Sequence, residues 1–155
     1  MFKIRFASGS AGKTRKLGEA LGAELRKGFP KSRRGIIIRL KGNLGSGKTT
    51  FIQGIARGLG LRHRIVSPTF LLMRVYPFTK QGRSKKLLHI DAYRIATKKD
   101  AAILENKKFF ENPLHIIVVE WPERIPALVR GPAIQINFLH GARENERSII
   151  IQTKP

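Results

Sequence analysis

The stretch G-N-L-G-S-G-K-T at positions 42–49 constrains this chain more than any other part of its sequence. It fits G-x-x-x-x-G-K-[ST], the pattern of loops that cradle nucleotide phosphates, at Gly42, Gly47, Lys48 and Thr49. An apolar run at 36–40 predicts a strand before the loop, and apolar residues at helical spacing from 51 to 59 predict a helix after it. Strand, loop and helix in this order are the context that the motif needs, so a chance glycine-rich turn is a poor explanation.

The residue types in this loop indicate what it would bind. Glycines let the backbone curl so that its N–H groups point at phosphate oxygens. Lys48 would reach the β- and γ-phosphates, and Thr49 would place its hydroxyl on Mg²⁺. The sequence therefore predicts a site for a nucleoside triphosphate with Mg²⁺. No N-K-x-D guanine signature is visible, which favours ATP over GTP.

Composition narrows the class of protein. The length of 155 residues predicts a single domain, 1–155, and no window holds the roughly 20 apolar residues that span a bilayer. The chain has no Cys, which excludes a disulfide framework and a thiolate zinc site. Residues 2–6 alternate apolar and basic side chains, which predicts a strand with one buried face, formed by Phe2, Ile4 and Phe6, and not a signal peptide. We therefore expect a cytoplasmic protein.

The charge is unusual for a chain of this size. Lys and Arg number 31 against 10 acids, which gives a net charge of +21. Residues 26–90 hold 16 of these basic residues and no acid. Such a chain is drawn to polyanions, which include nucleotides, RNA, DNA and acidic protein surfaces, so contact with RNA is one expectation. A basic composition common to a whole lineage, or a high-salt habitat, would explain the charge as well.

The remaining pattern predicts an α/β fold: a P-loop NTPase-like three-layer core with a mixed, mostly parallel sheet and antiparallel additions. Strands are predicted at 2–6, 70–76, 87–91, 115–119, 133–139 and 148–152. A helix is predicted at 13–27, ended by 28–30, with Leu17, Ala20, Leu21 and Leu25 as its apolar stripe. Residues 77–86 suggest a loop between antiparallel strands, 97–112 fit a helix, and 123–129 fit a short helix.

Two carboxylates stand where predicted strands end. Asp91 follows the strand at 87–90, and Glu120 follows the more apolar strand at 116–119. In open α/β sheets strand tips of this kind meet the ligand. We assign Glu120 to Mg²⁺ together with Thr49, and Asp91 to orienting or deprotonating the attacking water, with the two roles open to exchange.

Two further residues have a functional and a structural interpretation. Thr69 lies after the phosphate-loop helix, where its hydroxyl could sense the γ-phosphate or simply cap a turn. Trp121 is the only Trp and could be a core residue. The histidines show no metal-ligand spacing, and His89 is interpreted as a strand residue.

Five motifs in order make the chain resemble the TsaE (YjeE) family, the small ATPases of tRNA threonylcarbamoyladenosine synthesis. They are T-R-K-L-G at 14–18, G-N-L-G-S-G-K-T-T at 42–50, S-P-T-F at 67–70, H-I-D-A-Y-R at 89–94 and E-W-P-E-R at 120–124. The phosphate loop is shared by many ATPases, whereas the last three motifs together are much more specific. One segment departs from the family: 98–108 is basic and lacks the acidic, glycine-containing character that relatives usually have here.

The resemblance implies a Mg-dependent ATP hydrolase that works with TsaD and TsaB. Those partners transfer the threonylcarbamoyl group to adenosine 37 of tRNAs reading codons that begin with adenine. Thr14 would lie near the adenine, Asp91 and Lys48 would serve hydrolysis, and Thr49 and Glu120 would hold Mg²⁺. The residues expected to line the nucleotide site are Thr14, Leu44, Gly45, Ser46, Gly47, Lys48, Thr49, Thr50, Thr69 and Trp121.

Two other functions fit parts of the sequence. A small P-loop kinase or phosphotransferase would need an Arg-rich lid. No such lid can be assigned, although R-S-K-K at 83–86 could be mistaken for one. A basic RNA-binding module with a degenerate nucleotide site would bind tRNA without ATP. The complete phosphate loop counts against degeneracy.

Overall fold

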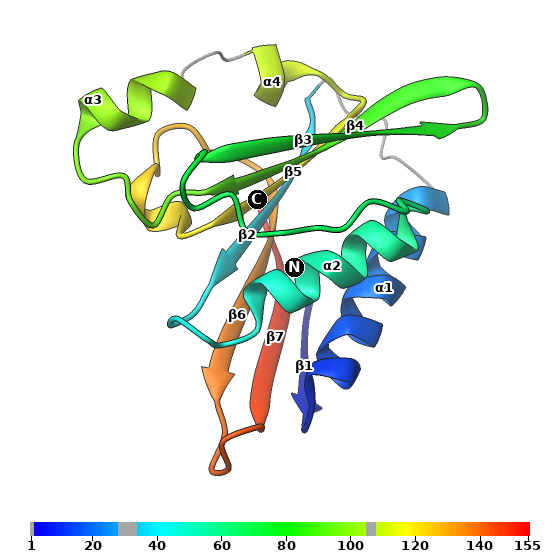
Figure 1. The fold of residues 1–155 in the computed structure, drawn as a ribbon, viewed down its shortest axis with the longest axis vertical. Helices are drawn as coiled ribbons and strands as arrows, with labels where there is room; N and C mark the ends of the chain where they lie inside the picture. The colour runs from blue at the N-terminus through cyan, green and yellow to red at the C-terminus, as the bar shows by residue number, and fades with distance from the viewer. Residues whose placement is uncertain (1, 28–33, 105–107) are drawn as a thin grey trace.

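A computed structural model of the chain describes residues 2–27, 34–104 and 108–155, which form one seven-stranded sheet with helices packed on it (Figure 1). The strand order across the sheet is β1-β7-β6-β2-β5-β4-β3. The strands are β1 Lys3–Ser8, β2 Ile36–Lys41, β3 Met73–Lys80, β4 Arg83–Asp91, β5 His115–Glu120, β6 Ala133–His140 and β7 Arg147–Lys154. The helices are α1 Ala11–Lys27, α2 Lys48–Gly58, α3 Lys98–Ala101 and α4 Lys108–Glu111, with the 3-10 helices η1 Ala102–Leu104 and η2 Pro122–Arg124.

The centre of the sheet is parallel and its edges are antiparallel. β2 pairs in parallel with β5 and β6, and β4 pairs in parallel with β5. The antiparallel pairs β3–β4, β6–β7 and β1–β7 extend the sheet on both sides. Every residue of β5 is buried, as expected for a parallel strand covered on both faces. The predicted α/β fold, with a mixed sheet and antiparallel additions, is confirmed.

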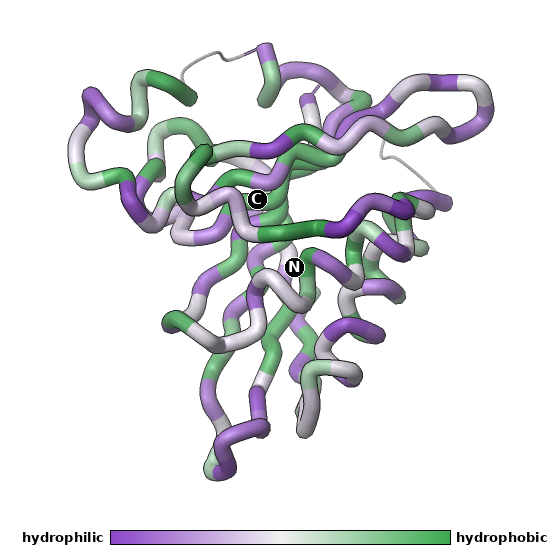
Figure 2. The backbone as a smooth tube through the Cα atoms, in the orientation of Figure 1, coloured by the Kyte–Doolittle hydropathy of each residue, from purple (hydrophilic) through white to green (hydrophobic). Residues whose placement is uncertain are grey.

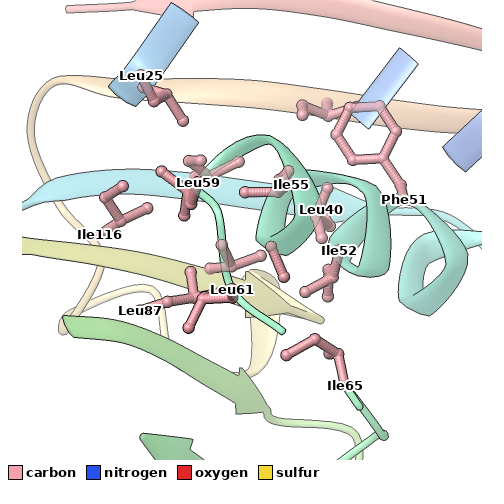
Figure 3. Close-up of a cluster of buried hydrophobic side chains, with 14 of the residues drawn as sticks. Leu25, Leu40, Phe51, Ile52, Ile55, Leu59, Leu61, Ile65, Leu87 and Ile116 are labelled. Atoms are coloured by element: carbon pink, nitrogen blue, oxygen red, sulfur yellow. The ribbon is translucent and has the colours of Figure 1, made fainter. Parts of the chain in front are cut away.

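Apolar cores lie on both faces of the sheet, which gives the three layers. In β5, Ile116 and Val118 face the core beneath α1 and α2, while Ile117 and Val119 face the opposite core. Figure 3 shows side chains of the first core, among them Phe51, Ile52, Ile55, Leu40 and Leu87. The second core is closed by short helices and turns that contribute Leu104, Phe110, Ile125 and Val129. Each fully buried Ile or Leu contributes about 1.5–3 kcal/mol, so β2, β5 and α2 are held firmly around the loop that joins them.

Glycines allow the backbones of α1 and α2 to approach each other closely. A Cβ on Gly18 would lie 2.2 Å from the carbonyl oxygen of Phe51, and one on Gly22 would lie 2.2 Å from that of Ile55. The buried residues of α1 are Thr14, Gly18, Gly22 and Leu25. The predicted apolar stripe holds for Leu25, which is buried, and for Leu17 and Leu21, which pack against the core, but it is wrong for Ala20, which is exposed. The helix begins at Ala11, two residues earlier than predicted, and its predicted end at 28–30 lies outside the described residues.

The β3–β4 hairpin corrects the prediction for residues 70–86. Phe70 and Leu71 are exposed and precede the strand, which begins at Met73. The predicted loop is mostly strand, because β3 runs to Lys80 and β4 begins at Arg83. Gln81 and Gly82 join them with φ of 49° and 71°, the positive values that a tight type I′ hairpin turn requires. The basic stretch 83–86 belongs to β4 and so forms no separate lid segment.

Other predictions hold with shifted bounds. β1 is an edge strand, and its predicted buried face is only partly present: Phe6 packs against the core, whereas Phe2 and Ile4 are 57% and 37% exposed. The predicted helix at 123–129 is only η2 followed by turns. The predicted helix at 97–112 is divided into α3, η1 and α4, and 105–107 lie outside the described residues.

Hydropathy follows this layering: in Figure 2 the hydrophobic stretches concentrate in the central strands. In the described part of the chain, no helix combines the length and the apolar character needed to cross a membrane.

Candidate functional site

The loop at 42–47 joins the end of β2 to the start of α2, and glycine is required in it. Gly42, Gly45 and Gly47 have φ of 153°, 70° and 98°, values that other residues rarely adopt. A Cβ on Gly42 would also lie 2.7 Å from the Ser46 hydroxyl and 2.9 Å from the backbone oxygen of Phe138. The backbone is thereby curled tightly at the N-terminal end of α2, where unpaired N–H groups favour an anion.

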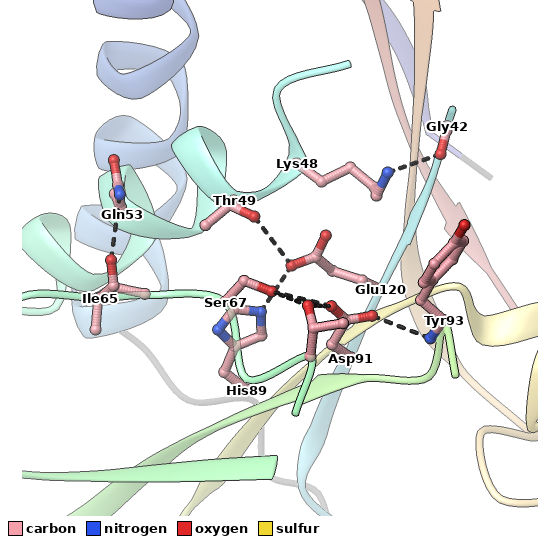
Figure 4. A network of polar contacts seen from close by, with 11 residues as sticks. Gly42, Lys48, Thr49, Gln53, Ile65, Ser67, His89, Asp91, Tyr93 and Glu120 are labelled. Carbon is pink, nitrogen blue, oxygen red and sulfur yellow. Dashed lines mark hydrogen bonds and ion pairs between the residues drawn. The ribbon is translucent and has the colours of Figure 1, made fainter. Parts of the chain in front are cut away.

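Lys48 is buried at this helix end, with an exposed fraction of 5%. Its ammonium donates one hydrogen bond to the carbonyl oxygen of Gly42 at 2.7 Å (Figure 4) and one to that of Asn43 at 2.9 Å. It also lies 4.6 Å from the centre of the Trp121 ring. Burial lowers the pKa of Lys48, while the charges of Glu120, Asp91 and Glu123 oppose that shift. A cation is therefore held beside the curled loop with negative groups near it.

Thr49 and Glu120, predicted as the Mg²⁺ ligands, lie together. The Thr49 hydroxyl donates to Glu120 Oε1 at 3.3 Å (Figure 4). His89 Nε2 lies 2.8 Å from the same carboxylate oxygen and is fully buried. The side chain of Glu120 is 5% exposed, so its neighbours fix its direction. His89 is a strand residue as predicted, but its contact with Glu120 was not anticipated from the sequence.

Asp91 ends β4 directly beside Glu120, since the two residues are paired in the β4–β5 register. Its Oδ2 accepts hydrogen bonds from Ser67 at 3.0 Å and from Thr69 at 2.6 Å. Its Oδ1 accepts one from the backbone N–H of Tyr93 at 3.0 Å. Thr69 therefore belongs to the same cluster as the strand-end acids, and Ser67 joins it.

Trp121 and Tyr93 form an aromatic wall on this cluster. Their ring centres are 5.2 Å apart and the rings are tilted by 49°. Trp121 is half-buried, and it also packs against the core on that face of the sheet. Its φ of 58° and ψ of 50° are left-handed, a strain of about 1–3 kcal/mol of the kind that clusters at functional sites. Trp121 thus contacts the core on one side and lines the site on the other, so both interpretations of this residue apply in part.

These groups line one cavity of about 330 Å³ at the carboxyl ends of β2, β4 and β5. Except for Thr14, every residue predicted for the site lies on it: Leu44, Gly45, Ser46, Gly47, Lys48, Thr49, Thr50, Thr69, Asp91, Glu120 and Trp121. The sequence-based site did not include Ser67 or Tyr93, although both belong to the S-P-T-F and H-I-D-A-Y-R motifs that mark this edge.

Thr14 lies on the other side of the glycine loop. It lines a smaller hollow of about 130 Å³ that also includes Gly45, Gly47, Thr50 and Arg147. Thr14 is 3% exposed, and its hydroxyl lies 2.8 Å from that of Ser8. Arg147 donates to the carbonyl oxygen of Gly45 at 3.1 Å, a contact that no local sequence pattern indicates. The two hollows share Gly45, Ser46, Gly47 and Thr50, so a ligand on the loop can meet both.

The oxygen atoms available in the cavity suit a cation whose remaining ligands are water molecules and phosphate oxygens. In the described ranges, no group of three or more His, Asp or Glu side chains is arranged to hold a metal ion. One hydroxyl and one carboxylate, Thr49 and Glu120, face each other instead. Mg²⁺ is commonly held in this way, by one or two protein oxygens together with substrate phosphates and waters.

Comparison with known proteins gives a consistent result. The family model described as "Threonylcarbamoyl adenosine biosynthesis protein TsaE" matches residues 8–149. Similar curated proteins carry the name tRNA threonylcarbamoyladenosine biosynthesis protein TsaE. The one from Synechocystis is 43% identical over 61% of this chain, and the one from Treponema pallidum is 35% identical over 79%. The match spans 59% of the Synechocystis protein and 81% of the Treponema protein.

A solved structure has the same fold. The crystal structure of Bacillus subtilis YdiB superposes with a TM-score of 0.67 at 24% identity. The match covers 98% of this chain and 85% of YdiB. The fold is thus shared over almost the whole chain.

Proposed function

The chain belongs to the TsaE family, and from that premise we propose that it is a Mg-dependent ATPase of tRNA threonylcarbamoyladenosine biosynthesis. It would act in the cytoplasm with TsaD and TsaB, whose product is the modified adenosine 37 of tRNAs reading codons that begin with adenine. The observation that carries the ATPase proposal is the convergence of Lys48, Thr49, Asp91 and Glu120 on one cavity at the phosphate loop.

The cavity fits a triphosphate with Mg²⁺ in size and in polarity. A volume of about 330 Å³ is at the lower end of small-ligand sites. The Cβ-free backbone at Gly45 and Gly47, which line the cavity, allows close approach of phosphate oxygens. Thr49 and Glu120 would hold Mg²⁺, which when bound neutralises charge on the β- and γ-phosphates.

The protein's own groups then have separate tasks in hydrolysis. Lys48 can exchange its carbonyl partners, Gly42 and Asn43, for phosphate oxygens without leaving the loop. The backbone N–H groups at the start of α2 would stabilise the negative charge of the transferred phosphoryl group. Asp91 would position the attacking water and accept a proton at Oδ2, where Ser67 and Thr69 now donate. Because these two hydroxyls lie in the segment after α2, the position of that segment controls the base.

The nucleoside end would lie toward the smaller hollow. Thr14 lines that hollow on the far side of Gly45–Gly47, which agrees with the adenine contact that the family resemblance implies. Trp121 and Tyr93 would close the cavity at its other end, beside the phosphates, and so exclude water other than the nucleophile.

Reconstitution with cognate TsaB and TsaD tests this function directly. Threonylcarbamoyl transfer to tRNA is measured over many turnovers, with and without this chain and ATP. We expect continued turnover only when both are present, and Lys48→Ala should remove the effect because the buried cation is lost. Turnover that is unchanged by the chain would contradict the proposal. Phosphate transfer from ATP to a small acceptor, without free phosphate, would instead identify a kinase.

A further inference from the structure

A second hollow, outside the nucleotide cavity, is lined by a concentration of cationic side chains. It has a volume of about 630 Å³ and is formed by α1, the end of α2 and the segment after it. Its charged or polar lining residues are Arg15, Gln53, Arg57, Arg62, His63 and Arg64. No Asp or Glu lines it. The nucleotide site uses none of these residues.

These arginines are wholly or partly open to solvent, and no carboxylate in the described part of the chain is paired with them. Arg57, Arg62 and Arg64 are exposed, and Arg15 is half-buried. Within the described residues, none of the four takes part in an ion pair. Arg26 lies beside them, since a Cβ on Gly60 would be 2.6 Å from its guanidinium. The C-terminal end of α2 adds a partial charge of about −0.5, which four guanidinium groups outweigh.

The chemistry of the lining favours a polyanion over a small molecule. Small-ligand pockets are mostly apolar with a few placed polar groups, whereas this hollow is lined mainly by guanidinium and imidazole groups. Guanidinium groups match phosphate geometry with paired hydrogen bonds. They and the exposed His63 ring can also stack on unpaired bases.

We infer that this hollow is a binding site for the phosphate backbone of RNA. The choice of RNA over an acidic protein surface rests on the proposed function, in which tRNA is the molecule that is modified. It also rests on the run 26–90, where 16 basic residues occur without an acid, because a polyphosphate carries charge along its whole length. Phosphate contacts of this kind give position and affinity but little sequence preference.

The hollow and the nucleotide cavity are joined by one short segment. Gln53 of α2 accepts a hydrogen bond from Arg15 at 3.4 Å and donates one to the carbonyl oxygen of Ile65 at 3.2 Å (Figure 4 shows the second). Arg64 precedes Ile65, and Ser67, which bonds Asp91, follows two residues later. RNA in the hollow would thus contact the segment that holds the proposed base.

The test measures binding of labelled tRNA by fluorescence anisotropy without nucleotide, from about 50 to 200 mM NaCl. The variant R57Q/R62Q/R64Q should lose about tenfold or more in affinity at the lower salt, and its log–log salt slope should fall by about two to three. The matched control K3Q/R5Q/K154Q removes three exposed charges at the β1–β7 edge and should lose much less. Equal losses in both variants, or none in the first, would overturn the inference.

Two further measurements make the outcome decisive. Crosslinking of the unmodified chain to tRNA containing 4-thiouridine should place adducts in residues 53–65, and adducts confined to other regions would contradict the site. Polyglutamate that displaces tRNA at equal charge concentration would instead assign the hollow to an acidic protein. Since ATP is absent throughout, a chain that binds RNA here but hydrolyses no ATP would retain this inference and lose only the proposed function.

Discussion

Asp91 and Glu120 are neighbours in the sheet, yet they accept hydrogen bonds from different partners. Glu120 meets Thr49 and His89, whereas Asp91 meets Ser67, Thr69 and the backbone of Tyr93. The partners of Glu120 are the phosphate-loop helix and a buried imidazole, and those of Asp91 are hydroxyls of a surface segment. This difference supports the metal role for Glu120 and the water role for Asp91.

Substitution of the two acids should therefore separate metal dependence from rate. In Glu120→Gln, the Mg²⁺ concentration for half-maximal ATP turnover should rise by about 10- to 100-fold, since one ligand charge is lost. In Asp91→Asn, kcat should fall by about 10²- to 10⁴-fold with little change in that concentration. Turnover measured against MgCl₂ for both variants decides this. If the Mg²⁺ response shifts in the Asp91 variant and not in the Glu120 variant, the roles are exchanged.

At the scale of elements, the packing of α1 on α2 depends on the absence of side chains. Gly18 and Gly22 on α1 meet backbone atoms of α2, and Gly54 and Gly58 on α2 would meet Arg15 and Glu19 oxygens at 2.1 Å if they carried a Cβ. Because those atoms are backbone, no rotamer change can make room. The two helices would have to separate, and α2 begins at Lys48 of the phosphate loop.

Gly18→Ala should consequently destabilise the chain although alanine is the better helix former. Overpacking of this kind costs about 1–3 kcal/mol in the free energy of unfolding. The matched control is Gly12→Ala in the same helix, where only the Ser10 hydroxyl lies within 4 Å, at 3.8 Å. That change should stabilise by up to about 1 kcal/mol, through helix propensity and a less flexible unfolded chain. Urea unfolding followed by circular dichroism measures both, and a similar effect of the two substitutions would contradict the glycine contact.

The elements that were predicted correctly from the sequence are those whose pattern lies within a short run of residues. The phosphate loop and the strands before Asp91 and Glu120 follow from runs of a few residues, and the structure places them as predicted. The glycine face of α1 was missed because helical periodicity registers apolar side chains and not the close approach of a second helix. The exposure of Phe2 and Ile4 was missed because an alternating strand does not show whether it lies at the edge of a sheet. The His89–Glu120 contact depends on the β4–β5 register, which no single strand encodes.

For the whole molecule, the net charge of +21 on 155 residues opposes compaction. Among the described residues, Lys and Arg form two ion pairs with carboxylates, Lys27–Glu24 and Arg143–Glu146, both between exposed side chains. Most basic side chains therefore repel one another across solvent, where salt screens them within a Debye length of about 10 Å at 0.1 M.

Stability should consequently rise with ionic strength. Raising NaCl from about 50 to 500 mM should increase the urea midpoint of the unmodified chain, because the repulsion is stronger in the folded state than in the expanded one. The K3Q/R5Q/K154Q variant, with three charges fewer, should gain less from the same addition. A midpoint that does not move with salt would mean that the charges are already compensated by bound anions.

The pairing of Asp91 with Glu120 has a consequence for how the sheet is assembled. A slip of β4 by two residues against β5 would keep every side chain on its own face of the sheet, although it would put Lys85 or His89 where Leu87 packs in the core. It would also move Asp91 by about 6.6 Å, well beyond reach of Ser67 and Thr69. The slip would therefore change burial locally in β4, whereas it would disperse the whole hydrogen-bonded group around Asp91. The proposed ATP hydrolysis depends on that group. Its rate would therefore detect a misaligned β4 more sensitively than a measurement of compactness or of secondary-structure content.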